Sequence, residues 1–466
     1  MRGGGRAITL LILASASITF GADPPSSPET TARKLRQSAL DDPTAYAIVS
    51  DLTTLFGPRP AGSSAEKRAA EWCAETMKSM HLANVHIEEF ALTEWRRGEE
   101  HGEIVGIGAQ RLVITALGGT PATEANGVEG EVVIFPTLDD LKSAADGSLR
   151  GRIAMLDYRM SRTESGLPYN VATRGRGEGP LEAAARGAIA FVLRSAGTGE
   201  HRLPHTGGTR FKDGRVPIPA FALAQQDADQ IVRLAAKGAV RLRLSSTARL
   251  VAGQKSQNVI GEVPGSHPDE IITIGAHLDS WDLGTGAVDD GAGVGIVLAT
   301  AKLLASMKPA RTIRVVLFGA EEVTQPDAPF FIVGGNAYAQ AHKDEIARYV
   351  IASEADLGAG RIIGLDLPQG WATSDFATVA ARVLLPLGIL VESEAAPHGG
   401  ADNFPLQTLG VPVFLFKQDA SRYFDLHHTA DDTLDKIDPA ELRQNVAAWT
   451  SMLWLVSESG ANFRQP

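Results

Sequence analysis

The segment GAHLDSWDLGTGAVDDGAG, which runs from Gly275 to Gly293, gathers one histidine and four aspartates within nineteen residues, together with five glycines. Four carboxylates this close repel one another, and they lose hydration if they are buried. They therefore need a counter-charge, and a bound metal ion is the simplest one. The chemistry expected of this segment is metal binding.

Further residues of metal-binding type follow other apolar, strand-like runs of the chain. They are His277 and Asp279 after IITIG, Glu321 and Glu322 after VVLFGA, Glu354 and Asp356 after YVIAS, and the histidine pair of DLHHTADDT near the C-terminus. In open α/β sheets, ligands bind in the crevice beyond the carboxyl ends of the strands. Four separate segments are therefore predicted to converge on one site.

The residue types allow distinct roles within such a site. Zinc takes neutral imidazole nitrogens and carboxylate oxygens, and two zinc ions about 3.5–4 Å apart can share one carboxylate. Asp289, in the glycine-rich run VDDGAG before a predicted helix, suits the shared position because this loop can approach both ions closely. Asp279, two residues beyond His277 on an extended chain, lies on the same side and can orient the imidazole. Neighbouring Glu321 and Glu322 point in different directions, so one can bind metal while the other handles protons.

Each of these residues also has a structural interpretation when it is taken alone. These interpretations are a structural histidine for His277, a solvated charge pair for Glu321 and Glu322, a helix cap for Asp289 and Asp290, and a surface loop for His427 and His428. All four segments coincide with strand ends or a helix start and carry ligand types of the same metal. This coincidence favours one metal site over four unrelated explanations.

The elements that must position these residues have an α/β pattern. After Gln257, apolar β-type runs such as EIITIGAHLD and RTIRVVLFGAEE alternate with helical runs such as GVGIVLATAKLLASM. This alternation predicts a sheet with helices on both faces. Residues 43–92 are predicted to form helices, a loop and an edge strand, and residues 126–251 an inserted block of short strands and helices.

Length and composition set outer limits on the function. With 466 residues the chain exceeds the size of one hydrophobic core, which predicts two domains. The formal net charge of −11 argues against nucleic acid and anionic membranes as partners. Cys73 is the single cysteine, which excludes an internal disulfide, and its place on the apolar face of a predicted helix indicates a buried thiol.

The N-terminus has the pattern of an export signal. Arg2 and Arg6 precede an apolar run, residues 7–20, which is followed by small residues and two prolines. Residues 1–22 are predicted to be a secretory signal peptide. A membrane anchor is the alternative, but the apolar run is shorter than the roughly 20 residues that a membrane span requires. The mature protein is expected to be secreted or periplasmic and free of the membrane.

Several of these motifs resemble one family. GAHLDSWDLGTGAVDDGAG, FGAEE, SEAD and HHTADDT are similar to motifs of the co-catalytic dizinc exopeptidases, and HLDSWD and GAxDDGxG are typical of the carboxypeptidase Q branch. The likeness extends over most of the mature chain. It implies the zinc-exopeptidase fold, a mixed α/β sheet with helices on both faces, over residues 23–125 and 252–466. Residues 126–251 resemble the β-rich protease-associated domain that this branch carries as an insert.

The resemblance implies a role for each motif residue. It places two Zn²⁺ ions per chain, with His277 and Asp356 on one ion, Glu322 and His428 on the other, Asp289 between them, Glu321 as general base and Asp279 orienting His277. Of the two neighbouring histidines, His428 fits the family's spacing to Asp-Thr, and His427 is the alternative. The family also implies a cis peptide bond between Asp289 and Asp290.

Two parts of the chain depart from the family pattern. The loop of residues 323–335, VTQPDAPFFIVGG, is longer than the usual glycine-rich turn. Asn403 stands where many relatives outside this branch have a histidine. Substrate contacts in the loop therefore cannot be carried over, and His398, Asp402 and Tyr423 stay candidates for such contacts.

The function implied by the resemblance is hydrolysis of a peptide bond next to a free terminus, in short peptides, with Glu321 taking a proton from a metal-activated water. Relatives suggest a homodimer. Two other classes are weighed against it: a non-catalytic receptor that has lost its metals, and a single-zinc acyl transferase similar to glutaminyl cyclase. The complete set of candidate ligands argues against the first, and the presence of both His277 and Asp356 argues against the second. Aminopeptidase, carboxypeptidase and dipeptidase stay open.

Overall fold

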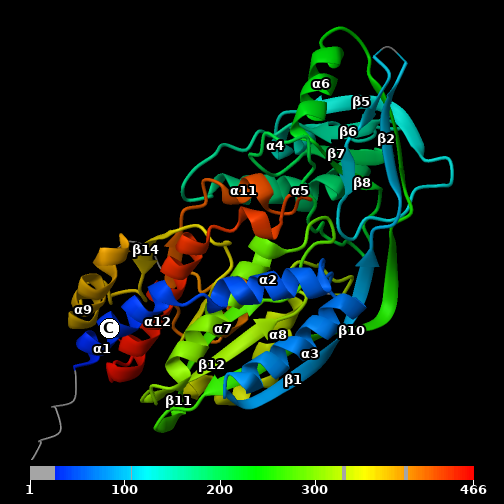
Figure 1. Ribbon diagram of the computed structural model, residues 1–466. Helices are drawn as coiled ribbons and strands as arrows, with labels where there is room; N and C mark the ends of the chain where they lie inside the picture. Colours follow the sequence, from blue (N-terminus) through cyan, green and yellow to red (C-terminus); the bar gives the residue numbers. More distant parts are fainter. Residues whose placement is uncertain (1–26, 107, 328–331, 393–396, 466) are drawn as a thin grey trace, which may run out of the picture.

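The structure is a computed structural model that describes residues 27–106, 108–327, 332–392 and 397–465. The predicted signal peptide, residues 1–22, lies outside the described residues. The chain forms two units, each built around its own sheet, which Figure 1 shows one above the other. None of the helices in the described ranges has the length and apolar character that crossing a bilayer requires.

The first unit contains a mixed five-stranded sheet. In spatial order its strands are β1 (Ala83–Arg96), β10 (Arg249–Val263), β12 (Arg311–Phe318), β11 (His267–His277) and β13 (Tyr349–Glu354). β11 runs parallel to β12 and β13, whereas β10 is antiparallel to β1 and β12. A smaller sheet consists of β15 (Leu390–Glu392), β14 (Ile362–Asp366) and β16 (Leu415–Gln418). A bridge between Ala352 and Val413 joins the segment before β16 to β13.

Helices cover both faces of the five-stranded sheet, as the sequence predicts. One face packs against α1 (Pro28–Asp41), α2 (Thr44–Phe56), α3 (Ser64–Ser79), α7 (Ala292–Ala305), α9 (Asp375–Leu384) and α12 (Pro439–Glu458). The other face packs against α8 (Val333–Ala341) and α10 (Phe404–Thr408). Every residue of β12 is buried, which is typical of a strand covered on both sides.

Helix α7 anchors the segment of residues 278–291, which carries the predicted metal ligand Asp289 and is called the metal loop below. Its sequence, AGVGIVLATAKLLA, is apolar on nearly every side, and such a helix is stable only when it is buried on nearly every side. It lies against α2, α12 and β11. Cys73 belongs to the same core, which confirms the predicted buried thiol, and this burial raises the pKa of the thiol to about 12.

The second unit is an eight-stranded sheet with its own helices. Its strands, in spatial order, are β3 (Gln110–Leu112), β2 (Glu100–Val105), β9 (Arg241–Ser246), β5 (Val128–Phe135), β6 (Ile153–Leu156), β7 (Ala190–Arg194), β8 (Ala220–Leu223) and β4 (Ile114–Ala116). Its helices are α4 (Leu138–Ser143), α5 (Pro168–Ala185) and α6 (Gln225–Ala235). Two separate hydrophobic clusters form its core.

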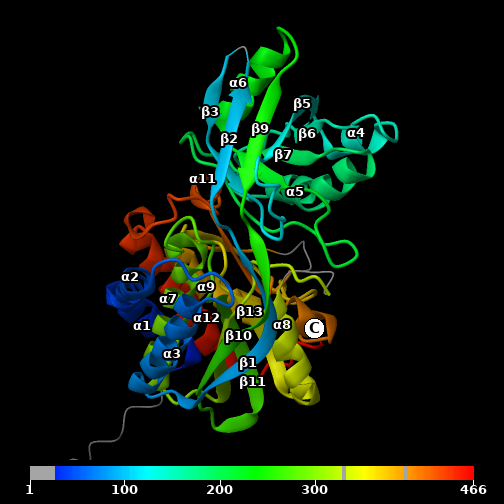
Figure 2. The same cartoon turned by 90° about the vertical axis from the view of Figure 1, so that its right-hand side faces the viewer.

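The second unit is inserted between two paired strands of the first. β1 and β10 pair up to Arg96 and Arg249, and in Figures 1 and 2 β1 leads into the second unit while β10 returns from it. The chain therefore enters the insert after Arg96 and leaves it before Arg249. The sheet begins at Glu100, well before the boundary at residue 126 that the sequence predicts. The sequence pattern does not reveal the first three strands of the insert, because β3 and β4 have three residues each and β2 carries charged residues.

Candidate metal centre

Three parallel strands end on one edge of the first sheet and carry predicted ligands there. β11 ends at His277, β12 ends shortly before the glutamate pair, and β13 ends shortly before Asp356. Asp289 enters from the turn Ala287–Gly291 that precedes α7. The peptide bond between Asp289 and Asp290 is cis, as the family resemblance implies.

Asp289 lies at the centre of the predicted ligand set. Its Oδ1 atom is 3.0 Å from Nε2 of His277, and its Oδ2 atom is 3.2 Å from Nε2 of His428. Nε2 of His277 is also 3.5 Å from Oδ1 of Asp356, and Nε2 of His428 is 3.0 Å from Oε2 of Glu322. The five predicted ligands therefore form two groups that share the Asp289 carboxylate.

The chemistry of this donor set fits a divalent metal. All five side chains offer an imidazole nitrogen or a carboxylate oxygen, and four of them are buried, while Asp356 is 20% exposed. Their N···O distances of 3.0–3.5 Å match two ligands of one tetrahedral ion with bonds of about 2.0–2.2 Å. Among the described residues, Oε1 of Glu322 is buried without a hydrogen-bond partner. A cation would satisfy this oxygen and the crowded carboxylates.

In the absence of metal, protonated imidazoles provide the positive charge that balances the carboxylates of this site. Burial lowers the pKa of His277, but neighbouring carboxylates, Asp279 foremost, raise it well above its ordinary value. Burial likewise lowers the pKa of His428, and Glu322 and Asp289 outweigh it and raise this pKa to about 9. Burial raises the pKa of Asp289, yet the surrounding imidazoles hold it well below the usual range. A metal ion competes with protons for these nitrogens.

Known proteins share this fold and much of this sequence. The pattern of Peptidase family M28 matches residues 258–453, which include all five predicted ligands. Carboxypeptidase Q of Mus musculus is 30% identical over 89% of this chain and 85% of its own length. A peptidase M28 precursor from Shewanella amazonensis superposes with a TM-score of 0.89 at 41% identity, and the match covers 93% of this chain and 98% of that chain. The chain belongs to peptidase family M28.

A more distant structure agrees on the fold. BSAP, a zinc aminopeptidase from Bacillus subtilis, superposes with a TM-score of 0.63 at 21% identity, and the match covers 90% of this chain and 96% of that chain. This M28 protein is a peptidase with the mixed α/β fold that the sequence predicts.

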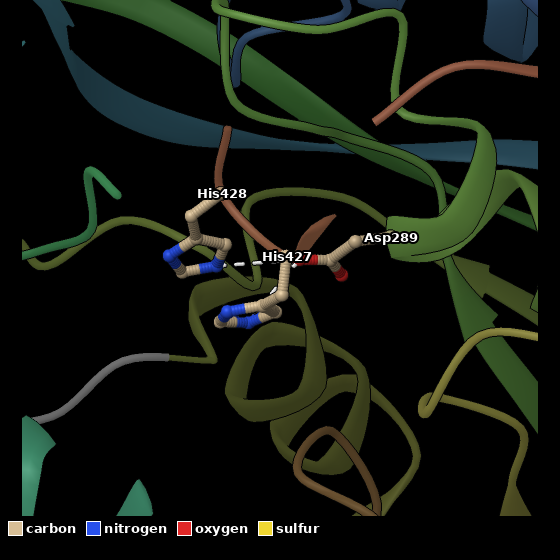
Figure 3. A group of neighbouring side chains, drawn as sticks. All are labelled: Asp289, His427 and His428. Atoms are coloured by element: carbon tan, nitrogen blue, oxygen red, sulfur yellow. Dashed lines mark ion pairs between the residues drawn. The ribbon is translucent and has the colours of Figure 1, made fainter. Parts of the chain in front are cut away.

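His427 and His428, the two histidines of DLHHTADDT, lie side by side, and Figure 3 shows both next to Asp289. Their rings stack with centroids 3.5 Å apart, and Nε2 of His427 is 3.4 Å from Oδ2 of Asp289. His428 lies in addition 3.0 Å from Oε2 of Glu322. Nδ1 of His428 is 3.1 Å from the carbonyl oxygen of Thr206, which can only accept, so Nδ1 carries the proton and Nε2 can bind metal. This geometry favours His428 as the ligand.

Asp279 contacts both His277 and the glutamate pair. Its backbone carbonyl oxygen is 3.0 Å from Nδ1 of His277, whereas its carboxylate Oδ1 is 3.7 Å away, too far for a hydrogen bond. The carboxylate instead accepts from the backbone N–H groups of Glu321, at 3.0 Å, and Glu322, at 3.3 Å. The contact with the His277 ring is therefore made by the carbonyl, and the carboxylate contacts the turn that carries the glutamates.

Glu321 lies beside the ligands on the turn after β12. Ala320 has a φ of 56°, and this left-handed residue reverses the chain just before the glutamate pair. Burial raises the pKa of Glu321 well above its ordinary value, the imidazole of His277 opposes this, and the carboxylate of Glu322 adds to it. A carboxyl group with a raised pKa is suited to accept and return a proton near neutral pH.

Two buried residues, Asp432 and Arg59, form hydrogen bonds to the backbone of the metal loop, and the sequence predicted a role for neither. Asp432 accepts from the backbone N–H of Val288 at 2.6 Å and of Asp289 at 3.2 Å. Arg59, with no exposed surface, donates to the carbonyl oxygens of Leu278, at 2.7 Å, and Gly286, at 2.9 Å. Arg59 lies in the segment FGPRPAGS and Asp432 in the motif HHTADDT. Their partners are backbone atoms, whose positions a sequence does not show.

The three candidates for substrate contacts have different surroundings. Asp402 is fully buried, and its Oδ1 atom accepts from the backbone N–H of Gly335 at 2.8 Å, a contact that supports the loop after the glutamates. His398 is exposed. The buried ring of Tyr423 packs against His427 with centroids 4.9 Å apart.

Proposed function

We propose that this M28 peptidase is a zinc-dependent exopeptidase that hydrolyses short peptides with free termini and holds two Zn²⁺ ions per chain. The carboxylate of Asp289 carries the proposal, because its two oxygens face different imidazoles at 3.0 and 3.2 Å. A carboxylate shared in this way is typical of two-metal sites. The name of the Bacillus subtilis relative, a zinc aminopeptidase, supports zinc as the metal.

The donor set divides between two ions. His277 and Asp356 would hold one ion, Glu322 and His428 the other, and Asp289 would contact both. When bound, such a pair supplies Lewis acidity, which lowers the pKa of water and stabilises negative charge on a carbonyl oxygen.

The proton transfers fall to Glu321. Its carboxylate accepts a proton from the attacking water and later returns this proton to the nitrogen of the leaving amine. Asp279 supports these transfers, since its Oδ1 atom holds the backbone N–H of Glu321 at 3.0 Å. Glu321 thereby stays on the turn beside the scissile bond while its proton moves.

The surplus of buried carboxylates points to the substrate class. A free α-ammonium group is the cation that such a site can attract, which favours short unblocked peptides. We further propose that the protein is exported, secreted or periplasmic, that it has no nucleic-acid partner and no membrane attachment after signal removal, and that it forms a homodimer. The inserted unit is proposed to be a protease-associated domain.

The test is a panel of free dipeptides, N-blocked dipeptides and aminoacyl anilides, with and without a chelator. We expect cleavage of free dipeptides, weak or no cleavage of blocked ones, loss of activity with chelator and recovery with Zn²⁺. One zinc ion per chain with amide cyclisation in place of hydrolysis would indicate a glutaminyl cyclase-like enzyme. A folded protein without zinc and without turnover would indicate a receptor-like binding protein.

Replacing His428 by alanine is expected to leave fewer than two zinc ions per chain, because a ligand of one ion is lost. Replacing His427 by alanine is the matched control, since the two rings stack on each other and both contact Asp289. Metal analysis of the two purified variants measures the difference. Full zinc content in His428→Ala together with loss in His427→Ala would transfer the ligand role to His427.

A further inference from the structure

One side chain of the metal loop contacts a predicted ligand without being a ligand itself. Trp281 lies on the segment between β11 and α7 and is 7% exposed. Its indole Nε1–H donates to Oε2 of Glu322 at 2.7 Å, and its ring lies 5.7 Å from the ring of His428. This hydrogen bond restricts the rotation of the Glu322 carboxylate, whose other oxygen has no partner among the described residues.

The inserted unit determines where this indole lies. A Cβ atom on Gly118 would come within 2.3 Å of Cη2 of Trp281, so the indole fits only against a glycine at this position. The ring of Trp95 meets that of Trp281 edge-on at 6.1 Å, and its Nε1–H donates to the carbonyl oxygen of Thr120 at 3.0 Å. The indole is thus enclosed by residues that enter and form the insert.

Arg97, whose side chain is 9% exposed, joins the residue after Trp281 to the insert. Nε and Nη2 of Arg97 donate to the carboxylate of Asp282, the residue after Trp281, at 2.8 and 2.7 Å. Nη1 of the same guanidinium donates to the carbonyl oxygen of Ala116 at 2.6 Å, and Nη2 to Oγ1 of Thr206 at 3.0 Å. A bidentate guanidinium of this kind joins the metal loop to the insert in one geometry.

The insert also contacts the histidine of the same ligand group. The carbonyl oxygen of Thr206 accepts from Nδ1 of His428 at 3.1 Å, and the backbone N–H of Thr206 donates to the carbonyl oxygen of His428 at 3.0 Å. Glu322 and His428, which lie 3.0 Å apart, are therefore both held by groups that the insert supplies or seats.

We infer that Trp281 is a positioning residue for the metal ligand Glu322, and that the inserted unit, through Gly118 and Thr206, is a structural part of the metal centre. This inference rests on the proposed function, because it assumes that Glu322 and His428 bind zinc. Groups that orient metal ligands from behind commonly change metal affinity when they are removed.

The experiment compares Trp281→Phe with Trp454→Phe in the full-length mature chain. Phenylalanine removes the indole N–H but keeps an aromatic ring. We expect Trp281→Phe to bind Zn²⁺ about 10- to 100-fold more weakly at one site in competition with a chromophoric chelator. We also expect a changed visible absorption spectrum after Co²⁺ substitution. Trp454→Phe, a buried indole on α12 that makes no contact with Trp281, is the matched control and is expected to match the wild type in both measurements.

Gly118→Ala provides an independent variant that keeps the indole N–H. Its added methyl group displaces the ring of Trp281, so the same loss of zinc affinity and the same spectral change are expected. If Trp281→Phe and Gly118→Ala both fold, by circular dichroism, and both bind Zn²⁺ and Co²⁺ as the wild type does, the positioning role is wrong while the proposed function stands. A wild-type protein that binds no zinc would overturn the proposed function and this inference with it.

Discussion

Glu321→Ala is expected to keep both zinc ions and to lose most turnover, with kcat lower by roughly 10²–10⁴-fold, the usual contribution of a general base. The ligand distances explain the retained metal, because the contacts of Asp289 with His277 and His428 do not involve Glu321. Metal analysis and steady-state kinetics with a free dipeptide measure the two effects on one preparation.

Glu321→Gln is the matched variant, since it keeps the size of the side chain and removes its ability to accept a proton. It should show the same zinc content and a similar loss of kcat. Wild-type kcat in either variant would remove Glu321 from the base role. Loss of zinc in both variants would instead make Glu321 a ligand.

The ligand motifs could be found from sequence because the chemistry and the secondary structure agree. His277, Glu322 and Asp356 each follow an apolar strand, and parallel strands bring their carboxyl ends to one edge of a sheet. Residue type then restricts the possible roles. The buried helix α7 was predictable for a similar reason, since its apolar run has the length and period of a helix.

Other parts of the fold could not be predicted because their cause is not in the side-chain pattern. Arg59 and Asp432 act on backbone atoms of the metal loop, so neither has a partner that the sequence would suggest. The start of the insert was placed too late, because β3 and β4 are three-residue edge strands. β3 pairs with the charged strand β2, and β4 pairs with β8, which lies far from it in the sequence. The role of Thr206 lies in its carbonyl group, which every residue type possesses.

Asp289→Asn is expected to have the largest effect of any single substitution in the centre. The variant keeps the size of the side chain but removes the negative charge that both proposed ions share, so zinc content should fall to one ion per chain or fewer. Its kcat/KM should lie below that of Glu321→Ala, which keeps its metals. Asp435→Asn is the control, because Asp435 is 70% exposed and pairs with Lys436 outside the site.

The same variant should also destabilise the metal-free protein. In the metal-free protein three imidazoles lie 3.0–3.4 Å from the Asp289 carboxylate. Burial raises the pKa of Asp289, but the contacts with His277 and His428, whose own pKa values are raised, help to hold it well below the usual range. A carboxylate with a lowered pKa stabilises the fold at every pH above its unfolded-state value, so this stabilisation is complete at pH 6. Removing one partner of a buried ion pair costs about 3–5 kcal/mol. Urea unfolding at pH 6 of the metal-free Asp289→Asn variant, prepared with a chelator, should show a decrease in unfolding free energy that approaches this size. An unchanged unfolding free energy together with two bound zinc ions would mean that Asp289 does not join the two ligand groups.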